Sequence, residues 1–148
     1  MGLFSKKPSQ REQNDISQNI FNVQSAYRSM YDGCGVEVYV DCKNRLMKSM
    51  NTLLAYEKKY PSYFKHPTPT ENAKKIQEEM QEVEMHFVDY TITYIEKKLL
   101  NYSTARGKTN NFNKETDKFK YYAGEFLPGT VEYFDKMLHE HFSEYIIS

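Results

Sequence analysis

The sequence predicts an all-α protein, an antiparallel bundle of four long helical stretches of which the last is broken near Pro128. Apolar residues recur at spacings of three and four in every long segment, which places them on one helical face. Residue types that start and stop helices separate these segments. One short run, residues 36–40, alternates as a strand would, but a lone strand would leave its backbone groups unpaired.

The first helix is expected to begin at Ser9. Glu12 follows three residues later, and the pair forms a candidate capping box. Gly33 is suited to the left-handed position that ends a helix. We therefore expect residues 1–8 to be a flexible tail and residues 9–148 to form one helical-bundle domain. The apolar face of this first helix consists of Ile16, Ile20, Val23, Tyr27 and Met30.

A second helix is predicted over residues 36–59. Its start is ambiguous, because the valines at positions 36, 38 and 40 alternate with Glu37 and Tyr39, as residues of a strand would. The continuation has helical spacing, and Tyr60-Pro61 breaks it, since proline disfavours helix at the preceding residue.

The third helix has the clearest start, with Thr68 as N-cap, Pro69 at the first helical position and Glu71 completing a capping box. We expect it to reach about residue 103, a length of roughly 50 Å. Ile76, Met80, Val83 and Phe87 are expected to be buried together. They belong to a coiled-coil-like seam of Ala73, Ile76, Met80, Val83, Phe87, Tyr90 and Tyr94. A second stripe consists of Val88, Ile92, Ile95, Leu99 and Tyr102.

The remaining chain is expected to hold a broken helical stretch. Residues 103–114 are rich in turn formers, and Gly107 is expected to stop the third helix. Aromatic residues at helical spacing follow from Phe112 to Phe126. Pro128 then starts or kinks a last helix, whose face is Val131, Phe134, Leu138, Phe142 and Tyr145.

Composition restricts the classes of function. The chain has 148 residues, with 20 basic and 20 acidic side chains. Neutrality argues against a nucleic-acid partner, because phosphate affinity comes mainly from accumulated Lys and Arg. No transmembrane run or signal peptide is recognisable. Cys34 and Cys42 lie eight residues apart, which is no metal or redox spacing, and reduced thiols fit a cytoplasmic protein.

No catalytic motif and no cofactor-binding loop is found, so we expect no enzyme activity and no cofactor. A metal- or ligand-binding bundle is one alternative, in which Glu82 and His86 would converge with Asp135 and His139. The Glu-x-x-His signature of di-iron bundles is absent, and solvated histidines are the simpler interpretation. The acidic run of the third helix is interpreted as a solvated face, formed by Glu78, Glu79, Glu82 and Glu84.

These features favour a non-catalytic, tyrosine-rich interaction module, an adaptor or regulatory subunit that binds a protein partner or a second copy. The long third helix would outrun its neighbours and need a cover for its apolar end. Either the broken fourth helix or another protein chain would supply that cover. The candidate interface consists of Tyr90, Tyr94, Leu99 and Tyr102.

The runner-up hypothesis is a peripheral membrane adaptor. The tail carries two apolar residues followed by two lysines, which would touch a membrane surface. A single short tail is a weak anchor, since stable attachment usually takes two signals. The candidate membrane contacts are Leu3, Phe4, Lys6 and Lys7.

Overall fold

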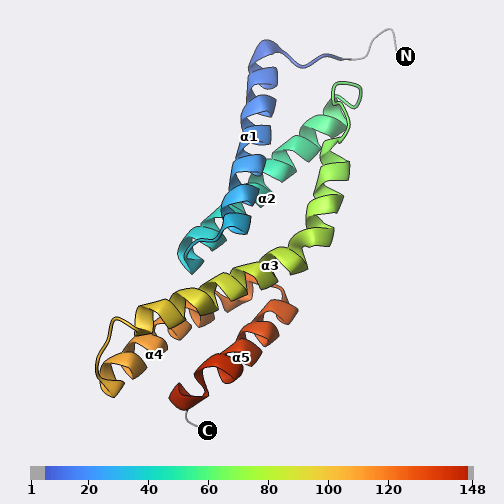
Figure 1. Cartoon of the computed structure of the whole chain (residues 1–148). Helices are drawn as coiled ribbons and strands as arrows, with labels where there is room; N and C mark the ends of the chain where they lie inside the picture. The colour runs from blue at the N-terminus through green and yellow to red at the C-terminus, as the bar shows by residue number, and fades with distance from the viewer. Residues whose placement is uncertain (1–5, 147–148) are drawn as a thin grey trace. The chain divides into compact units, whose positions relative to one another are not determined.

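The computed structural model describes residues 6–146, and over this range the chain is helical with no strand (Figure 1). The predicted all-α fold class is confirmed, and the last stretch is broken before Pro128 as expected. The helices are α1 (Gln10–Asp32), α2 (Val36–Lys59), α3 (Pro69–Leu99), α4 (Ala105–Tyr121) and α5 (Pro128–Phe142). Two short 3₁₀ turns, η2 (Ala123–Glu125) and η3 (Ser143–Tyr145), follow α4 and α5.

The helices pack as two compact units. Of the described residues, the first unit contains 6–30 and 41–80, and the second contains 31–40 and 81–146. The helices α2 and α3 therefore each contribute residues to both units. The expected division into a tail and one domain over residues 9–148 stays a prediction.

Two helix starts form the capping boxes that the sequence predicts. Before α1, the backbone N–H of Ser9 donates to Glu12 Oε1 at 2.9 Å, and the Glu12 N–H donates to Ser9 Oγ at 3.1 Å. Before α3, the Thr68 N–H donates to Glu71 Oε1 and the Glu71 N–H donates to Thr68 Oγ1, both at 3.3 Å. These bonds satisfy donors that a helix start leaves without intrahelical partners.

The boundary between α3 and α4 differs from the prediction. Helix α3 ends at Leu99 instead of about residue 103, and α4 already begins at Ala105. Gly107 is not a helix stop. Its N–H donates to Thr104 Oγ1 at 3.0 Å, so Thr104 is the N-cap of α4 and Gly107 lies in its first turn.

The first unit has an aliphatic core between α1, α2 and the start of α3. Helices α1 and α2 are antiparallel here, because Tyr60 at the end of α2 donates to Glu12 at the start of α1 at 2.8 Å. Tyr56 likewise donates to Asp15 at 2.7 Å. The buried residues include Ile16, Val23, Ala26, Met30, Leu46, Met50, Leu53 and Ile76.

The second unit has an aromatic core. The rings of Phe119 and Phe134 stack with centroids 3.7 Å apart, and those of Tyr39 and Phe87 with centroids 4.1 Å apart. Phe126 stacks on three of these four rings. Stacked aromatic rings contribute beyond their buried area, so this cluster is the main packing element of the unit.

The expected cluster of Ile76, Met80, Val83 and Phe87 is corrected in two respects. Met80 is only half-buried. Ile76 and Met80 belong to the first unit, whereas Val83 and Phe87 belong to the second. Beyond Phe87, burial on α3 moves from the seam to the second stripe, because Val88, Ile92, Ile95 and Leu99 are buried.

Candidate interaction surface

Two of the four predicted interface residues line a concavity in the second unit. Tyr90 and Tyr94 are one helical turn apart on α3, and they remain 40% and 45% exposed. The concavity has a volume of about 300 Å³. We call it the tyrosine groove; it is lined by residues 34–38 at the start of α2, by Tyr90, Thr91 and Tyr94 of α3, and by Glu115, Lys118 and Phe119 of α4.

The tyrosine groove combines buried apolar residues with the buried Glu115, which forms a part-buried ion pair with Lys98. Phe119 and Val36 are buried, while Val38 is exposed at the margin. Glu115 is buried, and Lys98 donates to its Oε1 at 2.5 Å. Lys118 lies 3.6 Å from the same oxygen. The bond to Glu115 raises the pKa of Lys98, which supports a charged pair. Such a site offers apolar area with a few oriented charges.

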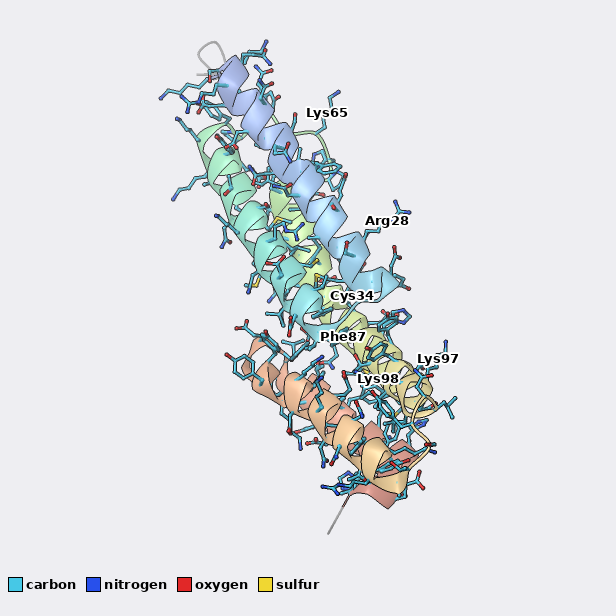
Figure 2. The ribbon with its side chains drawn as sticks, turned by 90° about the vertical axis from the view of Figure 1, so that its left-hand side faces the viewer. Arg28, Cys34, Lys65, Phe87, Lys97 and Lys98 are labelled. Carbon is cyan, nitrogen blue, oxygen red and sulfur yellow. The ribbon has the colours of Figure 1, made fainter. Side chains whose placement is uncertain are left out.

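The other two predicted interface residues lie differently. Leu99 is only 5% exposed and Tyr102 is half-buried. The expected overhang of α3 is therefore wrong at Leu99, because the second unit itself covers this side chain. Since α4 begins at Ala105, directly after a short turn, the chain can return along the end of α3. Figure 2 shows Lys97 and Lys98 at this end of α3.

Glu84 is a buried, hydrogen-bonded carboxylate whose burial the sequence analysis did not predict. The solvated-face interpretation is wrong for this residue, since it is 0% exposed. Its Oε1 accepts the backbone N–H of Leu127 at 2.9 Å and the Thr130 hydroxyl at 2.7 Å. Leu127 is the N-cap of α5 and has no side-chain cap of its own, so a carboxylate from α3 supplies the cap.

A sequence signal for Glu84 existed. The residue lies four positions before Val88, so it extends the second apolar stripe of α3 toward the N-terminus. A charged residue on an apolar stripe is rarely buried unless it is paired. The stripe therefore indicated a buried polar contact but not its partners.

The alternative of a metal site formed by Glu82, His86, Asp135 and His139 finds no support in the structure. Within residues 6–146, no group of three or more His, Cys, Asp or Glu side chains could hold a metal ion. His86 stacks instead on Tyr31, with ring centroids 4.9 Å apart. His139 Nδ1 lies 2.8 Å from the backbone oxygen of Asp135. Cys34 and Cys42 form no disulfide.

The candidate membrane contacts are only partly described. Leu3 and Phe4 lie outside the described residues. Lys6 and Lys7 are exposed, whereas Pro8 is buried and its carbonyl accepts from Gln13 Nε2 at 3.0 Å. Within the described range, no helix combines the length and apolar character needed to cross a bilayer.

Comparisons of the chain with protein-family models, with curated proteins and with solved structures found no match. The chemistry of the described surfaces therefore supplies the argument for function.

Proposed function

We propose that this chain is a non-catalytic, cytoplasmic helical protein that binds another protein chain through the tyrosine groove. The observation that carries the proposal is the pair Tyr90 and Tyr94, which remain partly exposed beside a concavity with buried apolar residues. Tyrosine is enriched at the buried centre of protein interfaces, where its ring is desolvated and its hydroxyl stays paired. A second copy of the chain is the first partner to test.

Light scattering over a range of concentrations tests self-association. We expect a species heavier than the 17.6 kDa monomer at high concentration. Tyr94→Glu would place a charge in the groove and weaken this association about thirtyfold, the effect of losing one interface hot spot of about 2 kcal/mol. The matched control is Phe21→Glu, because Phe21 is an aromatic residue of the first unit that is 61% exposed.

A monomer at all concentrations would exclude the second copy as partner. A photo-crosslinking amino acid at position 94 then tests for a different protein, with the same amino acid at position 21 as control. One defined crosslinked product that depends on position 94 supports the proposal. Products that are absent, or identical at both positions, would contradict it.

A further inference from the structure

The neutral charge of the chain conceals a separation of charge between its units. The first unit carries twelve basic and seven acidic residues, a net charge of +5, and the second unit carries the compensating −5. The neutrality of the whole chain is therefore no argument against an anionic partner of the first unit. Charge asymmetry between parts of a chain favours a charged macromolecular surface as partner.

Half of the basic residues of the first unit lie at one end of it. This end is formed by the start of α1, the end of α2 and the loop that leads into α3 (Figure 1). Lys59 of α2 pairs with Glu12 of α1 at 3.3 Å, and Glu57 of α2 accepts from Thr70 of α3 at 2.7 Å, so the three segments are in contact. We call it the basic end; its basic residues, all exposed, are Lys6, Lys7, Arg11, Lys58, Lys59 and Lys65.

The acidic residues of the basic end are engaged in local hydrogen bonds. Glu12 bonds Ser9, Tyr60 and Lys59. Glu57 accepts from both the backbone and the hydroxyl of Thr70. Glu71 caps α3 and also contacts His66.

By contrast, five of the six basic side chains pair with no acidic group among residues 6–146; only Lys59 does so. Figure 2 shows Lys65 extending from its loop. The basic end therefore keeps a net charge of +3, because its six basic side chains outnumber the three carboxylates of Glu12, Glu57 and Glu71.

Aromatic residues accompany this charge. Tyr63 and Phe64, directly before Lys65, pack edge to face with ring centroids 5.4 Å apart, and both remain partly exposed. In the sequence, Leu3 and Phe4 precede Lys6 and Lys7. A cluster of lysines beside apolar and aromatic side chains is typical of segments that bind anionic lipid headgroups.

We propose that the basic end docks on the surface of anionic phospholipid bilayers. The lysines would lie at the level of the headgroups, with the Tyr63–Phe64 loop at the interface. Apolar residues next to the charge favour a bilayer over nucleic acid, which offers phosphates and base faces but no hydrocarbon. The proposal goes beyond protein binding and does not depend on it, because the tyrosine groove belongs to the second unit and the basic end to the first.

Vesicle flotation with the full chain tests this proposal. We expect binding to vesicles of phosphatidylcholine mixed with phosphatidylserine, little binding to phosphatidylcholine alone, and a loss at high salt, where exposed charges are screened. Each lysine near an anionic surface changes the affinity about fivefold, so removing four lysines should weaken binding about a hundredfold or more. The test variant combines Lys6→Gln, Lys7→Gln, Lys58→Gln and Lys65→Gln.

A matched control removes the same number of charges from exposed lysines of the second unit. It combines Lys97→Gln, Lys114→Gln, Lys120→Gln and Lys136→Gln. We expect this control to keep vesicle binding within a few fold, and circular dichroism melts verify that both variants are folded.

Several results would overturn the proposal. Equal binding to neutral and mixed vesicles, or equal losses in the two variants, would show that the basic end does not recognise anionic lipid. Tighter binding to a single-stranded RNA oligonucleotide than to mixed vesicles, lost in the test variant, would assign the basic end to nucleic acid instead. Unchanged vesicle binding by Phe64→Ser would refute the placement of the loop at the bilayer.

Discussion

Removing the Glu84 carboxylate should destabilise the second unit more than removal of any exposed charge. Glu84→Ala would leave the N–H of Leu127 and the Thr130 hydroxyl without the acceptor they have at 2.9 Å and 2.7 Å. A hydrogen bond to a charged group contributes about 1.5–3 kcal/mol, so we expect a loss of about 3–5 kcal/mol in the free energy of unfolding. This is a large share of the roughly 5–15 kcal/mol that stabilises a small domain.

Urea denaturation measures this loss, and two further variants separate the cap from simple cavity formation. Glu84→Gln keeps the shape and one acceptor oxygen but removes the charge, so we expect a smaller loss of about 1–2 kcal/mol. Thr130→Val removes the hydroxyl with little change in shape. Combined with Glu84→Ala it forms a double-mutant cycle, in which each single variant removes the hydrogen bond between the two residues.

The cycle should give a coupling energy of about 0.5–3 kcal/mol, the range for residues in contact. A coupling near zero, or a Glu84→Ala variant as stable as the unmodified chain, would refute the assignment of Glu84 as the cap of α5. Hydrogen exchange supplies a second check. The first turn of α5 should lose protection in Glu84→Gln before α4 does.

Three further predictions concern stability. Gly33→Ala should lower the free energy of unfolding by at least about 1–2 kcal/mol, because Gly33 has a φ of +104° and an added Cβ would lie 2.5 Å from Tyr90 Cδ2. The control is Gly124→Ala, where the added Cβ meets open space. Equal melting temperatures for the two variants would contradict this prediction. Phe87→Ala should cost about 3–5 kcal/mol in urea denaturation, since it empties the centre of the aromatic cluster, and an unchanged midpoint would mean that Phe87 lies outside the core. The pKa of Glu12 is lowered from 4.5 to about 2, mainly by the backbone N–H that it accepts at the start of α1. The ionised Glu12 carboxylate therefore stabilises the fold above pH 4.5, and this stabilisation is lost as the pH falls toward 2. Between these two pH values, the melting temperature of Glu12→Gln should fall less than that of the unmodified chain. Melting temperatures that fall equally in both proteins would contradict this role of Glu12.

The helices and most of their ends follow from patterns in the amino-acid sequence. The capping boxes of Ser9 and Thr68 and the start of α5 at Pro128 are all as predicted. Each of these signals acts between residues at most four positions apart, so it is complete within a short stretch of chain. For residues 36–40 helix was predicted over strand on a different ground, because a lone strand would leave its backbone groups unpaired, and α2 does begin at Val36. At Gly107 the choice was wrong because the cap from Thr104, also local, was overlooked.

Which side chains are buried, and which groups contact one another, depends on how distant segments of the chain pack together. The position of Glu84 on the second apolar stripe of α3 does not reveal its partners, which lie 43 and 46 residues further along the chain. Leu99 and Tyr94 both belong to apolar stripes of α3, yet one is covered and the other lines the tyrosine groove. Helical periodicity indicates which residues share a face, but the burial of that face depends on the elements that pack against it. Those contacts join distant segments, so no local pattern records them.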